Sequence, residues 1–593
     1  MNDRFDRVKD IKDRSMDRGR RGVSHVIFGR TGVLIVCLLA EVLLLFLALH
    51  YVAQYIYLFF GTHVVFSFLI LLLILNRVEH PAFQLAWASL VLLFPIFGGL
   101  LYLYIKLQPG MRILERRMQE LDNHTRDLLP QDPAALRELS FENPRMAQLA
   151  YYVGEQRGCP VYRGSEVTYF ASGEEKYEEL KKQLRAAKQF IFLEYFIIAE
   201  GVMWDSVQEI LEQKVQEGVE VRLMYDGMNE LNNLPHDFSR KMKGLGIRCK
   251  VFSPVYPVIS TSYNNRDHRK IVVIDGQVAF TGGVNLADEY INRKERFGHW
   301  KDAAIMVRGE AAQSFTVMFL KMWDVTEKQE NIAVYLKKPE AAAGGAFAAG
   351  APEEQPPASE KAMEEQQKEQ PLEAAAKTIK EQQKEQPRET IAQVPEEQNE
   401  ENAGTSGQAQ ETGFVLPYAT NPLQETQTAE RVYLEILNSA QRYVHIMTPY
   451  LIPDHELLQA LLYAARRGVD VKLILPHIPD KKYAFALAHS YYKVLIHAGV
   501  RIFEYTPGFV HSKVVVSDDI CAVVGAINLD YRSLYLNFEC AAFLYEVPQI
   551  RDIEADFRRT LIECQLMTDF DIRHDKITRK IAGHVLKLLA PLM

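Results

Sequence analysis

The chain has 593 residues, of which 48% are hydrophobic and 24% charged, a composition that excludes a disordered or fibrous protein and is typical of a globular chain with apolar segments. Its net charge of −8 comes from one segment, because residues 339–412 hold 16 Asp/Glu and 6 Lys/Arg, a net of −10 that leaves +2 for the rest. The six cysteines show no CxxC or zinc-ligand spacing, so we predict packed thiols and no disulfide framework.

The N-terminal region is first basic and then strongly apolar. Residues 1–30 carry nine Lys/Arg and five Asp, which favours a determinant of membrane topology over an arm that binds lipid headgroups. Apolar stretches follow at 31–49, 55–75 and 82–105, each near or above the roughly 20 residues that cross a bilayer. We predict a membrane region over 31–106 with two or three apolar helices.

The number of crossings decides on which side of the membrane the rest of the chain lies. If the third apolar stretch crosses fully, the remainder lies outside, and if it is re-entrant, the remainder stays inside. The basic residues that follow this stretch favour the inner side.

Beyond a helical connector at 107–160, helix and strand patterns alternate as in an α/β domain. The first half is predicted to hold helices at 174–187 and 204–217 and strands at 167–171, 189–198 and 219–225. The second half repeats the pattern with helices at 425–440 and 455–467 and strands at 443–448 and 469–475. We therefore predict a tandem duplication, with domains at 161–338 and 413–593.

The segment between the two halves, 339–412, is rich in Ala, Glu, Gln and Pro and contains EQQKEQP twice, at 365–371 and 381–387. Such a composition cannot bury enough apolar surface to offset the entropy of ordering. A disordered acidic linker is predicted, and a solvated spacer is favoured over a partner-binding segment.

Each half carries the same set of polar residues at an offset of 243 positions: His268, Lys270, Asp275 and Asn285 in the first, and His511, Lys513, Asp518 and Asn528 in the second. Side chains two apart in a strand share a face, so each histidine–lysine pair is expected at one spot of a buried strand. The aspartates fit turns that lead into a second strand, at 278–281 and 521–524. One active site built from two halves is predicted.

Two imidazoles, two ammonium groups and two amides around one point suit a phosphodiester. One imidazole can attack phosphorus and form a covalent phosphohistidine, while the other protonates the departing alkoxide. Lysine and asparagine would hold the charge on the equatorial oxygens. This set of groups requires neither a metal nor another cofactor.

Both copies match the pattern HxKxxxxD and resemble the phospholipase D superfamily. Within it the chain is most similar to bacterial-type cardiolipin synthases, because the two motifs continue through a set of further polar residues: Asp288, Glu289 and Asp302 in the first half, and Asp530, Arg532, Ser533, Asn537 and Glu539 in the second. The likeness spans about 76–335 and 413–593 and fails over the linker and the basic arm.

The resemblance implies two phospholipase D-like α/β sandwich domains behind an N-terminal transmembrane helical region, in a multi-pass protein of the bacterial plasma membrane. It implies transphosphatidylation between two phosphatidylglycerol molecules, giving cardiolipin and glycerol. By this analogy His268 is the nucleophile and His511 the general acid and then base, although the near symmetry leaves that order open. Asp302 and Glu539 would orient the imidazoles, or else be ordinary surface acids.

Four positions qualify this picture. Asp275 and Asp518 complete the catalytic signature, yet they fit turn or scaffold positions as well as direct chemistry. Gly283 and Ala526 stand where many members of the superfamily have serine, so a hydroxyl contact to phosphate is missing from both halves and backbone N–H groups would have to substitute.

Several functions share these residues. A hydrolase and a transferase form the same covalent intermediate and differ in whether water or an alcohol reaches it. Membrane anchoring favours the transferase, because lipid acceptors are concentrated at the bilayer. The alternative is a membrane-bound phospholipase D hydrolase, or a transphosphatidylase with a different alcohol.

Two further classes are disfavoured. No nucleic-acid partner is expected, because no stripe of interleaved basic and aromatic residues lies outside the basic arm. A lipid-binding scaffold with a decayed site would lack a motif histidine or lysine, and none is lacking. The halves supply a full site without dimerisation, and the oligomeric state is left open.

Overall fold

The structure is a computed structural model that describes residues 39–47, 56–77, 79–107, 109–254, 264–325, 330–336, 413–423 and 427–592. These residues all belong to one compact unit. The predicted basic arm (1–30) and the predicted linker (339–412) lie outside them.

Three N-terminal helices, α3 (Ile56–Leu75), α4 (Pro81–Leu93) and α5 (Pro95–Lys106), pack together around Ile70, Trp87 and Tyr102. The predicted apolar stretch 82–105 is thus two helices, because Pro95 lacks the N–H that would continue α4. Of the predicted stretch 31–49, only 39–47 is described, and it is helical. Among the described residues, no helix is both long and apolar enough to cross a membrane.

Helices also occupy the predicted connector: α6 (Pro109–Thr125), α7 (Pro133–Glu142) and α8 (Pro144–Arg157). Each begins with proline, whose missing N–H costs nothing in the first turn. Asp132 and Asn143 cap α7 and α8 by accepting hydrogen bonds from backbone N–H groups of the first turn.

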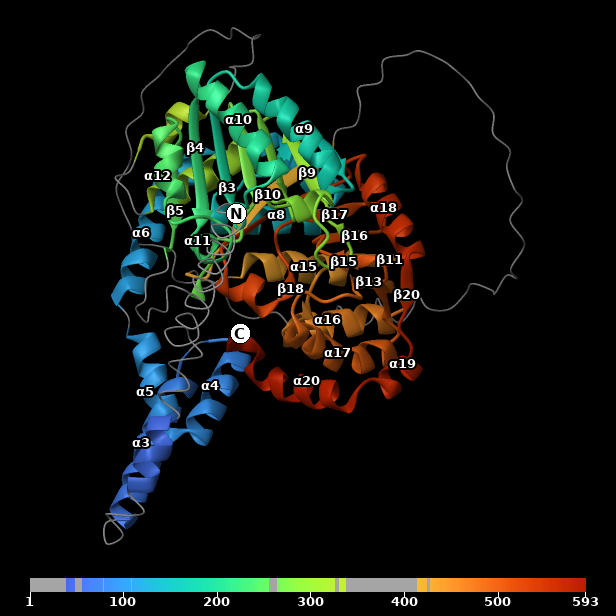
Figure 1. Ribbon diagram of the computed structural model, residues 1–593. Helices are drawn as coiled ribbons and strands as arrows, with labels where there is room; N and C mark the ends of the chain where they lie inside the picture. The colour runs from blue at the N-terminus through green and yellow to red at the C-terminus, as the bar shows by residue number, and fades with distance from the viewer. Residues whose placement is uncertain are drawn as a thin grey trace, which may run out of the picture. The chain divides into compact units, whose positions relative to one another are not determined.

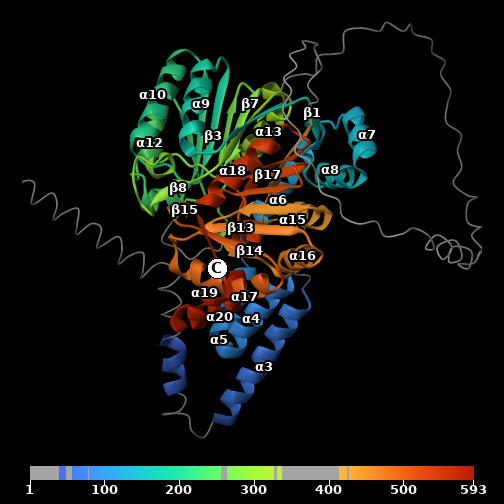
Figure 2. The same ribbon diagram turned by 90° about the vertical axis from the view of Figure 1, so that its right-hand side faces the viewer.

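The first half forms a seven-stranded mixed sheet, whose strands lie in this order: β2 (Glu166–Phe170), β9 (Ala304–Arg308), β7 (Val278–Gly282), β6 (Ile271–Ile274), β3 (Phe190–Tyr195), β4 (Glu220–Asp226) and β5 (Arg248–Phe252). Helices α9 (Gly173–Ala186), α10 (Val202–Gln216) and α12 (Phe238–Gly244) cover one face, and α13 (Ala312–Asp324) lies on the other (Figures 1 and 2). Strands β6 and β3 are buried throughout, as their apolar runs predict.

The second half forms a nine-stranded sheet. Seven of its strands repeat the order of the first sheet: β10 (Phe414–Thr420), β19 (Glu539–Tyr545), β17 (Cys521–Gly525), β16 (Val514–Ser517), β11 (Tyr443–Met447), β13 (Asp470–Pro476) and β14 (Arg501–Tyr505). Short strands β1 (Tyr162–Arg163) and β20 (Cys564–Leu566) extend the two edges. Parallel and antiparallel neighbours also match, so the two sheets share one topology and the predicted α/β class is confirmed.

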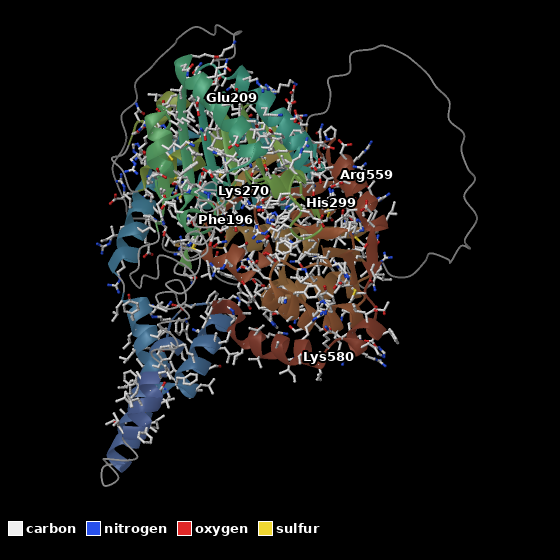
Figure 3. The ribbon with its side chains drawn as sticks, in the orientation of Figure 1. Phe196, Glu209, Lys270, His299, Arg559 and Lys580 are labelled. Atoms are coloured by element: carbon white, nitrogen blue, oxygen red, sulfur yellow. The ribbon has the colours of Figure 1, made fainter. Side chains whose placement is uncertain are left out.

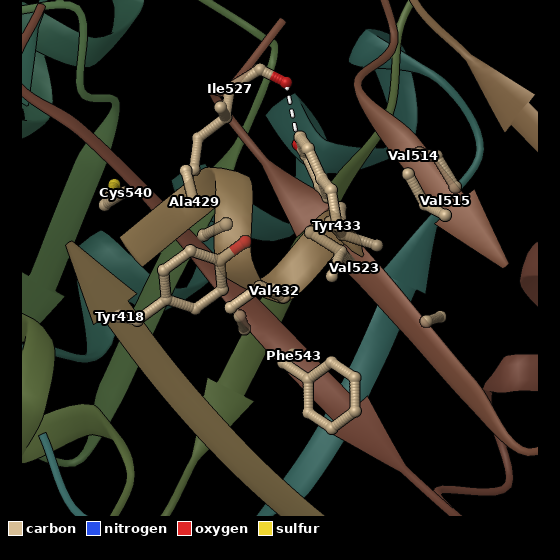
Figure 4. Close-up of a cluster of buried hydrophobic side chains, with 14 of the residues drawn as sticks. Tyr418, Ala429, Val432, Tyr433, Val514, Val515, Val523, Ile527, Cys540 and Phe543 are labelled. Carbon is tan, nitrogen blue, oxygen red and sulfur yellow. Dashed lines mark hydrogen bonds between the residues drawn. The ribbon is translucent and has the colours of Figure 1, made fainter. Parts of the chain in front are cut away.

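The helices of the second half are α15 (Thr428–Ser439), α16 (His455–Arg466), α17 (Lys482–His497), α18 (Ile550–Ile562), α19 (Asp569–His574) and α20 (Ile577–Leu589). Figure 4 shows α15 packed on the sheet through Val432 and Tyr433. The Tyr433 hydroxyl donates a hydrogen bond of 3.0 Å to the carbonyl of Ile527. This bond fixes the backbone beside Asn528, one of the predicted site residues.

The two halves join at short strands next to the motifs. Strand β8 (His299–Lys301) of the first half pairs in parallel with β15 (Gly508–Val510) of the second. A second bridge joins Asp267 to Phe538. Each histidine motif is therefore held by backbone contact with the opposite half.

Candidate active site

The histidine–lysine pairs lie just before the central strands. His268 and Lys270 precede β6, and His511 and Lys513 precede β16, so the strands begin after the pairs and do not contain them as predicted. The Lys270 ammonium donates to the carbonyl of His268 at 2.6 Å, and the Lys513 ammonium donates to the carbonyl of His511. Each lysine is thus fastened beside its own histidine.

Each imidazole is bound by a carboxylate from the other half. His268 Nδ1 lies 3.0 Å from Glu539 Oε2, and His511 Nδ1 lies 2.7 Å from Asp302 Oδ2. Both histidines turn Nδ1 toward an acid, and among the described residues neither Nε2 has a hydrogen-bond partner. In this orientation Nε2 is the atom available to a substrate.

Backbone hydrogen bonds also link each histidine to the opposite half. The N–H of His268 donates to the carbonyl of Phe538 at 2.9 Å, and the N–H of His511 donates to the carbonyl of Lys301 at 2.7 Å. Phe538 and Lys301 directly precede the two acids, so each histidine is tied twice to the opposite half. The site cannot be assembled from one half alone.

Burial and positive neighbours keep the imidazoles uncharged. Burial, Lys270 and Lys513 hold the pKa of His268 well below its ordinary value. Burial and Lys513 lower the pKa of His511 to about 4, although Asp302 opposes them. Lys513 and His511 of the second half also lower the pKa of His268, in agreement with the crossed pairs that join the motifs of both halves. A neutral imidazole is the form that can attack phosphorus.

The lysines carry depressed pKa values for the same reason. Burial lowers the pKa of Lys270 to about 8 and that of Lys513 to about 7. The Lys270 ammonium lies 5.6 Å from the centre of the Phe196 ring, and Figure 3 shows these two side chains close together. A bound phosphate would favour the charged form of both lysines.

The pKa values of the two carboxyl groups are shifted in opposite directions. Burial raises the pKa of Glu539 well above its ordinary value, and Lys270, Asn537 and Ser533 offset this only in part. The pKa of Asp302 is lowered in spite of its burial, because His511 and Lys513 lie beside it. The charged Asp302 stabilises an imidazolium at His511, while the raised pKa of Glu539 makes it the weaker counter-charge for His268.

The two asparagines are buried and held by protein groups. Asn285 Oδ1 accepts from the N–H of Ile197 at 3.0 Å, and its Nδ2 donates to Tyr290 at 2.7 Å. Asn528 Nδ2 donates to Ser533 Oγ at 3.0 Å. These bonds fix both amides next to the motifs, and contact with phosphate stays a prediction.

A direct catalytic role for Asp275 and Asp518 does not fit the structure. The Asp275 carboxylate accepts three backbone N–H groups, of residues 188, 189 and 190, and that of Asp518 accepts those of residues 441, 442 and 443. Both aspartates have positive φ, 52° and 58°, and stand in the turns after β6 and β16, at the strand ends opposite the histidines. Their carboxylates hold the start of the neighbouring strand, which is a scaffold role.

Two residues gain a role that the sequence did not indicate. A Cβ atom at Gly283 would lie 2.0 Å from Asp302 Oδ1, so glycine stands there because the carboxylate needs the space. Ser533 is fully buried in the π-helical turn η6 (Arg532–Leu536), accepts a hydrogen bond from Asn528 and partly offsets the raised pKa of Glu539. Only the extended motif after Asn528 pointed to this serine.

Within the described residues, His80, Asp454 and Glu456 place their ligand atoms within 4.8 Å of one another, as a metal site would. These groups already bind protein partners, because His80 Nε2 lies 2.8 Å from Glu456 Oε2 and Asp454 accepts from Tyr535 at 2.6 Å. Their observed role is to fasten α4 to the second half.

Comparison with known proteins agrees with this geometry. A family profile described as "Cardiolipin synthase, PLD-like domain" matches residues 180–323 and 433–561, once in each half. The chain is 30% identical over 532 residues to cardiolipin synthase 2 of Bacillus cereus, which covers 89% of this chain and 90% of that protein. The chain belongs to the cardiolipin synthase family.

Other relatives match over a similar length. A cardiolipin synthase of Geobacillus kaustophilus is 30% identical over 521 residues, 87% of this chain and 90% of that protein. An uncharacterized protein of Streptococcus mutans is 45% identical over 509 residues, 86% of this chain and 96% of that protein. Each of these relatives matches more than four fifths of this chain.

Proposed function

We propose that this cardiolipin synthase transfers the phosphatidyl group of one phosphatidylglycerol to a second, giving cardiolipin and glycerol. The observation that carries the proposal is the crossed pairing of His268 with Glu539 and of His511 with Asp302. It presents two Nε2 atoms to one substrate, with Lys270 and Lys513 beside them. This is the set of groups that covalent phosphoryl transfer requires.

In the first step, the Nε2 lone pair of His268 forms a bond to phosphorus. The bond from phosphorus to the glycerol headgroup oxygen breaks, and that oxygen takes the proton of His511 Nε2. In the second step, His511 Nε2 removes the proton from a glycerol hydroxyl of the second phosphatidylglycerol. That oxygen attacks phosphorus, the P–N bond breaks and His268 is restored. Positioned proton transfer of this kind contributes about 10²- to 10⁴-fold in rate.

The charges of the site fit this division of roles. In the free enzyme His511 is neutral at neutral pH. The negative charge of a bound phosphodiester, together with that of Asp302, favours the imidazolium form of His511, which then carries on Nε2 the proton that a general acid needs. The pKa of His268 is strongly lowered and that of its partner Glu539 is raised, so His268 stays unprotonated and nucleophilic. The lysines neutralise the equatorial oxygens as negative charge builds on them.

We also propose that the protein works at the bacterial plasma membrane, as a multi-pass protein held there by its N-terminal apolar region, where phospholipid substrates reside. Helices α3 and α4 contain no Lys, Arg, Asp or Glu. Large apolar side chains are exposed on both, among them Val64, Phe68, Leu92 and Leu93. Exposed apolar surface of this extent marks contact with lipid or with another protein.

The proposed reaction is tested by product analysis. Purified protein in detergent is given phosphatidylglycerol labelled in its headgroup, without a cytidine nucleotide. Labelled glycerol and cardiolipin in equal amounts are expected. Phosphatidic acid in place of cardiolipin would show that water accepts the phosphatidyl group and that the protein is a hydrolase. A phosphatidyl ester of another added alcohol, formed in preference to cardiolipin, would identify a transphosphatidylase with a different acceptor.

A further inference from the structure

Helix α20 (Ile577–Leu589) packs on α17 through a side that is marked by Gly583. A Cβ atom at this glycine would lie 2.4 Å from the carbonyl oxygen of Ala486, so the backbones of the two helices are in close contact there. Lys587 extends along the contact, with its ammonium 4.1 Å from the centre of the Tyr491 ring. The orientation of α20 about its own axis is therefore fixed.

The side of α20 that faces away from α17 is apolar. Four side chains spaced three or four residues apart form one stripe on it: Ile577, Ile581, Val585 and Leu588. Their exposed fractions are 68%, 59%, 59% and 39%. A helix of a globular protein normally buries such a stripe. These four side chains are thus more exposed than is normal for the apolar face of a helix.

Basic residues line one edge of this stripe. They are Lys580 and His584, and α20 contains no acidic residue. Lys580 lies at the outer edge of the molecule in Figure 3. A helix with an exposed apolar stripe and a cationic edge matches the plane of an anionic bilayer, where the apolar side chains enter the acyl boundary and the cations meet phosphate groups.

The stripe adjoins the apolar N-terminal helices. Helix α20 contacts α4, and Leu592, just beyond α20, packs against the cluster of Ile70, Trp87 and Tyr102 that joins α3, α4 and α5. Figures 1 and 2 show α20 beside α4. The exposed apolar side chains of α20 and of α3 and α4 thus belong to neighbouring elements of one packed unit.

We propose that α20 lies in the interfacial layer of an anionic phospholipid bilayer and forms a second lipid contact, separate from the N-terminal helices. Helix α17, on which α20 packs, contacts β12 (Leu451–Ile452), and β12 pairs with β18 (Leu529–Asp530) directly after Asn528. Contact of α20 with lipid therefore sets the orientation of the site toward the headgroup layer. The proposal concerns where the helix lies and does not depend on which reaction the site performs.

The test places an environment-sensitive fluorophore on the full chain. Val585→Cys carries the label, in a background of Cys37→Ser and Cys564→Ser, because Cys159, Cys249, Cys521 and Cys540 are buried. Val334→Cys is the matched control, since Val334 is 68% exposed on the 3₁₀ turn η5 (Ile332–Tyr335) of the first half. Both proteins are reconstituted into vesicles of phosphatidylglycerol and phosphatidylcholine, with and without spin-labelled lipid.

A blue shift and quenching by spin-labelled lipid are expected for the label at position 585 and not for the label at 334. Lys580→Gln should weaken bilayer binding of α20 by about fivefold. Equal, water-like emission at both positions would overturn the proposal. A shift at position 585 that already occurs in detergent and grows with protein concentration would also overturn it, because a second copy of the chain would then cover the stripe.

Activity provides a second measurement. Val585→Asp should lower turnover of phosphatidylglycerol in vesicles by about tenfold, because a buried valine is lost from the interface. Turnover in detergent micelles should stay within about twofold, as for an ordinary surface substitution. Val334→Asp should change neither rate. Equal loss in vesicles and micelles would mean that α20 only supports the fold.

Discussion

His268 in the first half is bound through Nδ1 to Glu539 in the second half, at 3.0 Å, although 271 residues separate them in the chain. His511 and Asp302 form the reciprocal pair at 2.7 Å. Each domain thus supplies the acid that binds the histidine of the other domain. Neither half retains the acid for its own histidine, so separation of the halves would dismantle both pairs.

The two acids should differ in how much their loss costs. Asp302→Asn removes a charge that stabilises the His511 imidazolium, and a loss of about 10²- to 10⁴-fold in kcat is expected. Glu539 has a raised pKa and so contributes less charge than Asp302. Glu539→Gln keeps the shape of the side chain, and the loss should be about tenfold, the cost of a perturbed buried hydrogen bond. Steady-state kinetics on both variants measures the difference. Asp205→Asn, on the exposed side of α10, is the control. Equal losses at 302 and 539 would contradict the assigned charges.

The absence of a side chain at position 283 should be essential for the placement of Asp302. Gly283→Ala puts a Cβ atom against the Asp302 carboxylate, and we expect both a lower kcat and a loss of about 1–3 kcal/mol in the free energy of unfolding. The matched change in the second half, Ala526→Gly, only removes a methyl group and should cost about 1 kcal/mol with little change in kcat. Chemical denaturation and kinetics on both proteins test this. An unaffected Gly283→Ala enzyme would show that Asp302 does not occupy the position described.

The motif aspartates should matter for stability more than for chemistry. Asp275→Asn and Asp518→Asn weaken three bonds to backbone N–H groups, and each should lower the free energy of unfolding by about 1–3 kcal/mol. The folded fraction should retain near-normal kcat, measured well below the melting temperature. A large fall in kcat without a change in melting temperature would restore the catalytic role that the signature predicts.

The pH dependence of kcat/KM follows from the lowered pKa values. His268 must be neutral to attack, and because its pKa is held well below the ordinary value of 6.5, the acid limb should lie well below pH 6.5. The lysines lose their charge as the pH rises through about 7 for Lys513 and about 8 for Lys270, so kcat/KM should fall above neutral pH. A pH profile in buffers of constant ionic strength measures both limbs. A basic limb near pH 10.5, the ordinary value for lysine, would show that the lysines are not buried as described.

Much of the fold could be predicted because its signals are local. The buried runs 271–274 and 514–516 and the turns at Asp275 and Asp518 carry their own patterns of apolar and turn residues, and the strands and turns occur there. Pro95 ends one helix and begins another within the stretch 82–105. The apolar composition on both sides of this proline favours a single long helix, so composition alone predicts the wrong element there.

The site could be predicted only as a set of residues. The repeated motif identifies the histidines and lysines from the sequence. The pairing of Asp302 and Glu539 with the histidine of the opposite half is a tertiary contact that no local pattern encodes. The role of Gly283 also depends on a residue 19 positions away that approaches it only in the folded chain. The exposed stripe of α20 could be recognised only once its packed side was known.

The most direct test of the central claim, that His268 and His511 act on one phosphorus atom, uses a phosphatidyl ester of p-nitrophenol. This leaving group departs without a proton, so the first step no longer needs an acid. His511→Ala should release a burst of p-nitrophenolate equal to the enzyme concentration and then stall, and His268→Ala should release none. A burst from His268→Ala, or none from the unchanged enzyme, would contradict the account.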